Sequence, residues 1–362
     1  MRQLPLSLDP QSRGSPSVGA LRGYSCPEGP HLPQTPTLHE GTAPRPRGVF
    51  RGGSPFFRAL IGALSLLTVM VPREAFAATA VVVKSADAGV YREAIEGFRA
   101  VTALTVGDLF DLEGDVGNGP AVVRKIKAMP NKPDLIYAVG IYALQALVGQ
   151  ITDIPIVFSM VLNPPVVVGP QVKNITGASI NVPIDVQLRS LKQLAPQVKR
   201  IGVVYDPSKT GFLLAAAQRV APELGVTVVA RPINSPRASV TALEELEKQV
   251  DALWILPDST ILTPETVQYM LLVAFRRKIP LLGLSDSQAK MGALVAISFR
   301  SGHDIGKQAG ELAKAILGGR PIEDVPYTMA DKTKQTLNLK TAEKIGLQIP
   351  PELIQRADVV IR

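Results

Sequence analysis

Histidine and cysteine, the side chains that most often carry nucleophilic, acid–base or metal chemistry, are scarce in this sequence. Its 362 residues include one cysteine, Cys26, and three histidines, of which two, His31 and His39, share the N-terminal stretch with Cys26. His303 is the one histidine after that stretch. A Ser/His or Cys/His catalytic pair and a histidine-based metal site both need partners that residues 78–362 do not supply. We expect no catalytic residue and no metal site.

Two further signatures of enzyme chemistry are missing. Gly117 and Gly119 begin like a dinucleotide-binding motif, but Val122 occupies the position of its third glycine. The pair is better interpreted as a turn before Pro120. No two carboxylates stand out by spacing as a pair for glycoside cleavage. We therefore expect no cofactor and no enzymatic activity.

Small polar residues follow the short apolar runs of the sequence, where the carboxyl ends of parallel strands would lie. At such positions a bound ligand meets backbone N–H groups and helix N-termini. The predicted ligand-binding residues of this kind are Ser85, Gly140, Ser159, Ser179, Tyr205, Asp258, Ser285 and Asp286.

Capping of the next helix is the alternative interpretation for any one of these serines. Asp206, which precedes Ser208, is interpreted as a cap rather than as a ligand contact. Asp258 has two interpretations, because an apolar strand precedes it and a helix begins only at Thr263. It either holds a cationic or hydrogen-bond-donating ligand group, or it orders the loop before Thr263.

These positions belong to a repeated alternation of strand and helix. Continuous apolar runs predict strands that are covered on both faces, at residues 80–83, 104–110, 135–139, 154–158, 200–205, 226–230, 252–256, 281–284, 294–297 and 336–339. Helices are predicted over 91–101, 120–129, 142–148, 208–224, 301–317 and 341–345, with further starts at Ser239 and Thr263. The alternation predicts an α/β fold of two doubly wound parallel-sheet lobes joined by a hinge.

The N-terminal region predicts export. Residues 1–50 are rich in proline and lack an apolar period, so we interpret them as disordered or as sequence upstream of the true translation start. Residues 51–77 have the pattern of a Sec signal peptide, with arginines, an apolar run and a cleavage site at Ala77. The apolar run has thirteen residues, whereas a membrane-spanning helix needs about 20. An uncleaved anchor is the alternative.

Cleavage after Ala77 would change the chemistry of the chain. It removes eight Lys/Arg, four Asp/Glu and Cys26, so the formal net charge falls from +8 to +4 and no cysteine is left for a disulfide or for lipid attachment. No cluster of basic residues with interleaved aromatics remains, which argues against nucleic acid as a partner. We expect a protein that is free in the periplasm.

Several pieces of the sequence, in this order and spacing, resemble the substrate-binding family of ABC transporters whose members include tryptophan- and other aromatic-amino-acid-binding lipoproteins. The matching pieces are 134–140, 154–158, 174–177, 199–205, 251–258, 292–294, 304–306, 316–319 and 337–346. The resemblance implies the type I periplasmic-binding-protein fold, whose chain crosses between the lobes three times. It implies lobe 1 at 79–161 plus 293–324 and lobe 2 at 162–292 plus 325–362.

The resemblance implies a solute-binding protein that delivers a small organic ligand to an ABC permease in the inner membrane; an extracytoplasmic ligand sensor is the alternative. Two cleft positions depart from the family pattern. Ile141 and Tyr142 replace its usual Thr-Pro, and Asn163 before Pro164 replaces its usual Asp. Tyr142 and Asn163 therefore join the predicted ligand-binding residues, and the ligand is expected to be an amino acid or another amphipathic solute.

Overall fold

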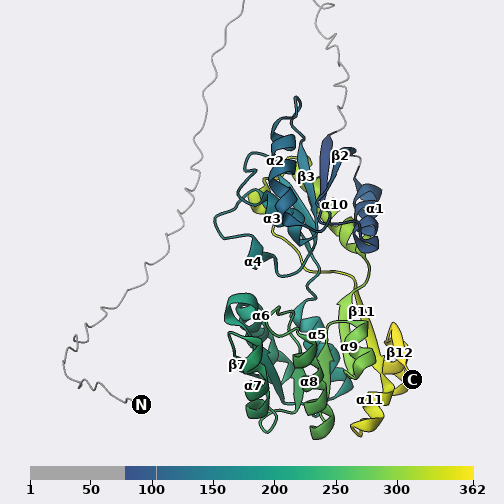
Figure 1. Cartoon of the computed structure of the whole chain (residues 1–362). Helices are drawn as coiled ribbons and strands as arrows, with labels where there is room; N and C mark the ends of the chain where they lie inside the picture. The colour runs from purple at the N-terminus through teal and green to yellow at the C-terminus, as the bar shows by residue number, and fades with distance from the viewer. Residues whose placement is uncertain (1–77, 103) are drawn as a thin grey trace, which may run out of the picture. The chain divides into compact units, whose positions relative to one another are not determined.

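The computed structural model describes residues 78–102 and 104–362, which form two parallel-dominated sheets with helices between the strands (Figure 1). The predicted disordered stretch 1–50, signal peptide 51–77 and cleavage site at Ala77 lie outside the described residues. Among the helices that are described, none has both the length and the apolar composition needed to cross a membrane.

Lobe 1 is built on a five-stranded parallel sheet in the order β2-β1-β3-β4-β5. Its strands are β1 (Thr79–Lys84), β2 (Thr105–Asp111), β3 (Leu135–Val139), β4 (Ile156–Val161) and β5 (Ile175–Ser179). Alternate residues of β1 point to opposite faces, as the pleat requires. Val81 and Val83 pack with α2 (Gly119–Lys127) and α3 (Ile141–Leu147). Ala80 and Val82 pack with α1 (Gly89–Val101) and α10 (Gly302–Leu317).

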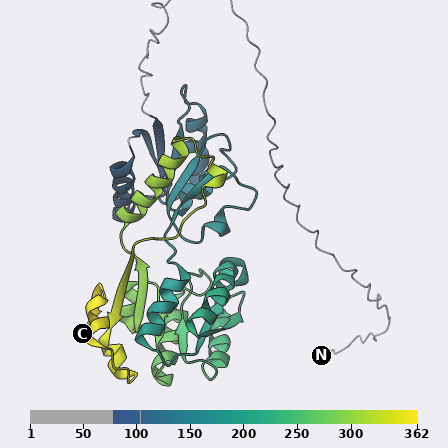
Figure 2. The ribbon, with the colours of Figure 1, turned by 180° about the vertical axis from the view of Figure 1, so that it is seen from behind.

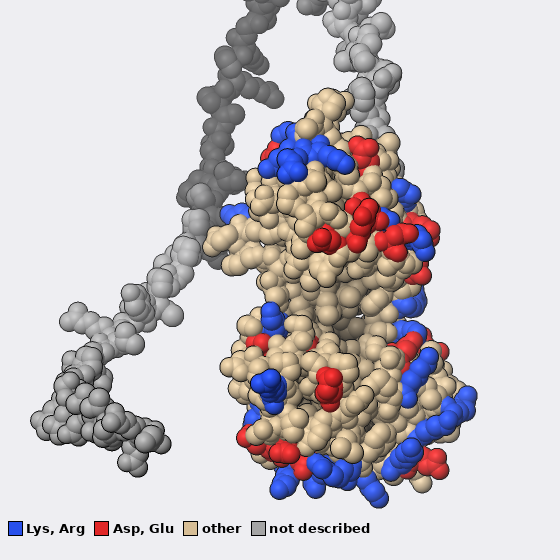
Figure 3. Space-filling model, in the orientation of Figure 1, with Lys and Arg blue, Asp and Glu red and all other residues tan. Residues whose placement is uncertain are grey.

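Lobe 2 is built on a seven-stranded sheet in the order β12-β11-β10-β9-β8-β6-β7. Its neighbouring strands pair in parallel except β10 and β11, which are antiparallel. Its strands are β6 (Arg200–Tyr205), β7 (Thr227–Pro232), β8 (Ala252–Trp254), β9 (Leu281–Gly283), β10 (Val295–Phe299), β11 (Thr333–Asn338) and β12 (Val359–Ile361). On the face of this lobe shown in Figure 3, acidic and basic side chains are interspersed, a pattern typical of a hydrated surface.

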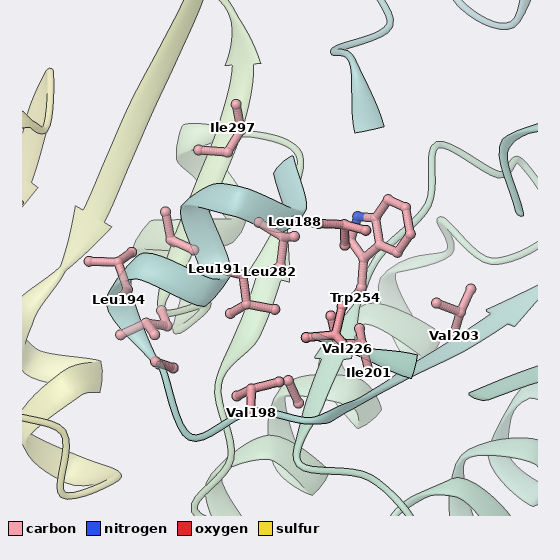
Figure 4. Packing of buried hydrophobic residues seen from close by; sticks show 14 of the residues in the cluster. Leu188, Leu191, Leu194, Val198, Ile201, Val203, Val226, Trp254, Leu282 and Ile297 are labelled. Atoms are coloured by element: carbon pink, nitrogen blue, oxygen red, sulfur yellow. The ribbon is translucent and has the colours of Figure 1, made fainter. Parts of the chain in front are cut away.

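Helices cover both faces of the second sheet. One face packs against α5 (Ile184–Leu194), α6 (Pro207–Val220) and α11 (Leu339–Lys344), and the other packs against α7 (Ser239–Leu246) and α8 (Pro264–Arg277). Figure 4 shows Leu188 and Leu191 of α5 beside Leu282 and Trp254 of the sheet. The shorter helices are α4 (Pro164–Val167), α9 (Asp286–Met291) and α12 (Pro351–Arg356), and four 3₁₀ turns lie at 116–118, 221–224, 236–238 and 322–324.

The chain crosses between the lobes after β5, after β10 and before β11 (Figures 1 and 2). The predicted lobe boundaries differ from this arrangement in three places. Residues 325–330 are predicted in lobe 2, but Thr328 pairs with Ala178 of β5, so they belong to lobe 1. Residues 162–180 include β5, which pairs with β4 and so belongs to lobe 1. Residues 293–299 include β10, which pairs with β9 and β11 and so belongs to lobe 2. Backbone partners decide which sheet a strand joins, and an apolar run in the sequence does not name its partner.

Glycines allow α10 to lie directly against α1. Gly302, Gly306 and Gly310 recur every four residues along α10, and therefore share one face of the helix. A β-carbon added at Gly306 would stand 1.9 Å from the backbone oxygen of Ala94, and one added at Gly97 of α1 would stand 2.0 Å from the backbone oxygen of His303. The two helix backbones are therefore closer than any residue with a β-carbon would allow at these points.

An arginine fork fixes the start of α10 after the second crossover. Arg300 donates from Nε and a terminal nitrogen to the two carboxylate oxygens of Asp304, at 2.8 and 2.7 Å. The Ser301 hydroxyl caps the helix by accepting from the Asp304 N–H, and it donates to the Asp304 carboxylate at 2.6 Å. The Arg300 fork holds the pKa of Asp304 well below its ordinary value, against the opposing effect of partial burial.

This depressed pKa predicts a contribution to acid stability. The carboxylate of Asp304 stabilises the fold fully above its unfolded pKa of about 4, and the contribution is lost as pH falls through the lower folded pKa. Asp304→Asn should therefore flatten the decline of melting temperature between pH 5 and pH 2, measured by circular dichroism. Glu311→Gln removes an exposed carboxylate from the same helix and is the control. An unchanged acid decline in Asp304→Asn would contradict this account.

Candidate functional site

Ser85 and Gly140 lie together at the carboxyl edge of the first sheet. Ser85 directly follows β1 and is 2% exposed, and its Oγ accepts from the N–H of Ala143 at 3.0 Å, in the first turn of α3. Gly140 follows β3 with φ of 89°. A β-carbon there would stand 2.5 Å from Ser85 Oγ and 2.9 Å from the ring and hydroxyl of Tyr91. Both the backbone angle and the close neighbours therefore require glycine.

Two tyrosines gather at the same edge. Tyr142, in the first turn of α3, is 40% exposed, and Tyr91, in the first turn of α1, is half-buried. Burial, and to a smaller extent the nearby Tyr142, raises the pKa of Tyr91. Tyr91 was not among the predicted site residues. The signal for it in the sequence is an aromatic residue in the first turn of the helix that follows Ser85.

Lobe 2 carries a hollow of about 250 Å³ at the carboxyl ends of its strands and beside the first crossover. Its lining is largely apolar, with a few amide and hydroxyl groups: Leu162, Ile180, Asn181, Val182, Gln187, Leu213, Pro257, Leu262, Leu284, Ser285, Gln288, Ile297, Ser298 and Phe299. A mainly apolar wall with a few placed polar groups is typical of small-molecule sites.

Gln187 connects this hollow to the core and to the crossover. Its Oε1 accepts from the indole N–H of Trp254 at 3.0 Å, and its Nε2 donates to the Val182 carbonyl at 2.9 Å. Both side chains are buried. Through these two bonds, Trp254 of the sheet fixes the position of the Gln187 amide in the wall of the hollow, and Gln187 in turn holds the backbone of the first crossover.

Three predicted residues, Ser159, Ser179 and Asn163, have buried side chains that bind other protein groups. Ser159 Oγ lies 2.6 Å from the hydroxyl of Tyr137. Ser179 Oγ donates to the side-chain oxygen of Asn181 at 2.6 Å. These contacts occupy the serines within the fold of lobe 1.

Asn163 adopts the left-handed conformation, with φ of 50°, and exchanges hydrogen bonds with Asn181. Its backbone N–H donates to the Asn181 side-chain oxygen, and its own side-chain oxygen accepts from Asn181 Nδ2, both at 2.7 Å. The Asn163 amide also donates to the Pro257 carbonyl at 2.6 Å, so it joins the loop after β4 to the loop after β8. Asn163 is 8% exposed, and these bonds indicate a role in the backbone around the first crossover.

Asp258 is fully buried, and protein donors surround its carboxylate. Oδ2 accepts from the Asp206 N–H at 2.8 Å and from the Thr210 hydroxyl at 2.5 Å, while Oδ1 accepts from the Thr260 N–H at 2.9 Å. These contacts favour the second interpretation of Asp258, an anchor for the loop between β8 and α8. Its neighbour Asp206 caps α6 through the Ser208 N–H, as predicted, and the Ser208 hydroxyl bond holds the pKa of Asp206 below its ordinary value.

The remaining predicted residues of lobe 2 differ in position. Ser285 caps α9 and lines the hollow. Tyr205 ends β6, half-buried against the core. Asp286 binds Lys334 and the Thr336 hydroxyl; although burial opposes them, these hydrogen bonds hold the pKa of Asp286 below its ordinary value. Of the ten predicted residues, Ser85, Gly140 and Tyr142 gather at one sheet edge, and Ser285 lies at the hollow.

The carboxyl edges of the two sheets are suited to noncovalent binding of a ligand. They offer aromatic faces, hydroxyls, amides and an apolar wall. Within the part of the chain that the structure describes, no group of three or more His, Cys, Asp or Glu side chains is placed to hold a metal ion.

Comparison with known proteins identifies the family. The family model described as "ABC transporter substrate binding protein" matches residues 103–361. The chain belongs to this family. A tyrosine-binding protein of Clostridioides difficile (strain R20291) is 29% identical to it over 250 residues, which cover 67% of this chain and 70% of the relative. An uncharacterized protein of Rickettsia prowazekii is 23% identical over 231 residues, 61% of this chain and 69% of that protein.

Solved structures share the fold of this substrate-binding protein. The ligand-free, open structure of a substrate binding protein with adhesive properties from Clostridium difficile has a TM-score of 0.61 at 22% identity and covers 79% of this chain and 99% of its own. An ABC domain from Streptococcus pneumoniae in complex with L-Trp has a TM-score of 0.55 at 22% identity, with coverage of 78% and 99%. The type I periplasmic-binding-protein fold and the role of a substrate-binding protein, not an enzyme, are thereby confirmed.

Proposed function

We propose that this protein is exported to the periplasm, binds an amino acid with an aromatic side chain, and delivers it to the permease of an ABC importer. The observation that carries the ligand class is the Tyr91–Tyr142 pair at the carboxyl edge of the first sheet. Aromatic rings favour offset or edge-to-face contact with another ring. The names of two related proteins state tyrosine or L-Trp as ligand, which supports the same class.

The rest of the site supplies the polar and apolar contacts that such a ligand needs. At the same edge as the tyrosines, the Ser85 hydroxyl holds the first turn of α3, and the lobe 2 hollow adds the Ser285 hydroxyl beside an apolar wall. In type I folds the ligand lies at the carboxyl ends of the strands. Export would follow cleavage after Ala77, and N-terminal peptide mapping of the periplasmic fraction tests that part of the proposal.

Tyr142→Ala should weaken binding of L-tyrosine or L-tryptophan about tenfold, the equivalent of about 1.4 kcal/mol, because it removes one aromatic face. Tyr142→Phe should bind nearly as well as the wild type, since the ring remains. Isothermal titration calorimetry measures both affinities. Tyr142 is 40% exposed, so the melting temperature of the empty protein should barely change.

Leu272→Ala is the matched control, because Leu272 is 55% exposed on α8 and does not line the lobe 2 hollow. Its affinity should equal that of the wild type. Wild-type affinity in Tyr142→Ala would remove this tyrosine from the site. Failure of all aromatic amino acids to stabilise the wild type in a melting scan would overturn the proposed ligand class.

A further inference from the structure

We infer that lobe 1 holds a second small-molecule site, beside β5, which takes a flat aromatic ring carrying both an ammonium and a carboxylate group. The site is a hollow of about 500 Å³ within lobe 1. Its lining is Phe158, Pro164, Pro165, Val168, Val172, Lys173, Ile175, Ile322, Glu323, Val325, Pro326 and Tyr327. None of these is among the predicted ligand-binding residues or the two tyrosines of the proposed cleft site.

An aromatic pair lies at the apolar end of this hollow. Phe158 of β4 is 1% exposed, and Tyr327, in the segment that leads to the third crossover, is 36% exposed. Their ring centroids are 6.4 Å apart and their planes are tilted by 41°. Tyr327 thus presents aromatic surface to the hollow over a buried ring, and aliphatic and proline side chains form the other walls. Such walls favour a flat apolar body over a sugar or an inorganic ion.

The charged groups of the hollow come from two segments. Lys173 precedes β5 and Glu323 lies in the 3₁₀ turn at 322–324, and both are exposed. Both also line an adjoining hollow of about 360 Å³, so they stand where the two hollows meet. Among the described residues, neither takes part in an ion pair of the chain.

Opposite charges at the junction match a zwitterionic head group. Lys173 can donate to a carboxylate and Glu323 can accept from an ammonium, while the ring of the same molecule occupies the apolar hollow. A volume of about 500 Å³ falls within the range of about 300–1,000 Å³ that small-molecule sites occupy. This site is separate from the Tyr91–Tyr142 edge and does not depend on the function proposed for that edge.

The test measures binding of 5-fluoro-L-tryptophan by ¹⁹F NMR, to the wild type and to the Tyr142→Ala variant. In the variant, binding at the proposed cleft site is weakened, so that the second site contributes more of the signal. The wild type should show two bound signals, and Tyr142→Ala should weaken only one. Adding Lys173→Gln or Glu323→Gln to Tyr142→Ala should weaken the remaining binding about 3- to 10-fold, an effect typical of exposed charges. Lys132→Gln, at an exposed lysine of the same lobe, is the control and should have no effect.

Two probes that each lack one charge assign the contacts. Fluorinated indole-3-propionate lacks the ammonium, so its binding should be insensitive to Glu323→Gln and still sensitive to Lys173→Gln; fluorinated tryptamine should show the reverse. A wild type whose single bound signal is the one that Tyr142→Ala weakens, or binding that neither charge variant changes, would overturn the second site. A single wild-type signal that is sensitive to the charge variants but not to Tyr142→Ala would contradict the proposed function and leave the second site supported.

Discussion

Gly306→Val is expected to prevent lobe 1 from reaching its native fold. The added side chain would begin 1.9 Å from the backbone oxygen of Ala94, and a backbone atom inside a helix cannot rotate away as a side chain can. Helix α10 would have to move away from α1, and this would expose Phe98 of α1 and Ile305 of α10, which are fully buried in the same core cluster. Overpacking a core costs about 1–3 kcal/mol, and loss of a helix–helix interface adds to it.

Gly211→Ala is the matched control, because Gly211 also lies inside a helix, α6, but no heavy atom comes within 4 Å of the added carbon. It should be neutral or stabilising by about 0.5–1 kcal/mol, since alanine is the better helix residue. Urea unfolding followed by circular dichroism measures all variants. Gly306→Ala should already be destabilised, and Gly306→Val unfolding within 1 kcal/mol of the wild type would show that the two helices are not packed as described.

Asp258→Asn is expected to lower the free energy of unfolding by about 2–3 kcal/mol. Each carboxylate oxygen accepts a backbone N–H, from Asp206 and from Thr260. An asparagine NH₂ group would face one of these donors in either orientation, so the N–H of buried Asp206 or of half-buried Thr260 would lose its acceptor. The side chain is fully buried, and water cannot replace the lost bond without opening the loop.

A graded series tests this account of Asp258. Thr210→Val removes the third donor and should cost less, about 1 kcal/mol, because the carboxylate keeps its two backbone donors. Asp286→Asn, at a partly exposed carboxylate, should cost less than about 1 kcal/mol. Melting temperature and ligand affinity are measured on each variant. A tenfold loss of affinity in Asp258→Asn without a lower melting temperature would return this residue to the ligand site.

Local structure was largely predictable from the sequence. Strands β3 and β6 have the predicted bounds, because continuous apolar runs are typical of strands covered on both faces. The cap at Asp206 forms as predicted, since a short side-chain oxygen before a helix accepts an N–H of the first turn. Helices also begin next to the predicted starts Thr263 and Ser301, where the hydroxyl is the cap. The short β5, at 175–179, was not predicted as a strand, because two of its five residues are Thr and Ser and one is Gly.

The sequence by itself determined the α/β class, the order of most elements and the scarcity of groups for catalysis, because these depend on residue type and on spacing along the chain. Only the tertiary structure decided which polar side chains remain available to a ligand. Asp258 and Asn163 follow strands as Tyr142 does, yet protein donors and acceptors far away in the sequence occupy both. Hydrogen-bond partners separated by 48 to 94 residues leave no local pattern, so burial and bonding at the sheet edges could be established only from the fold.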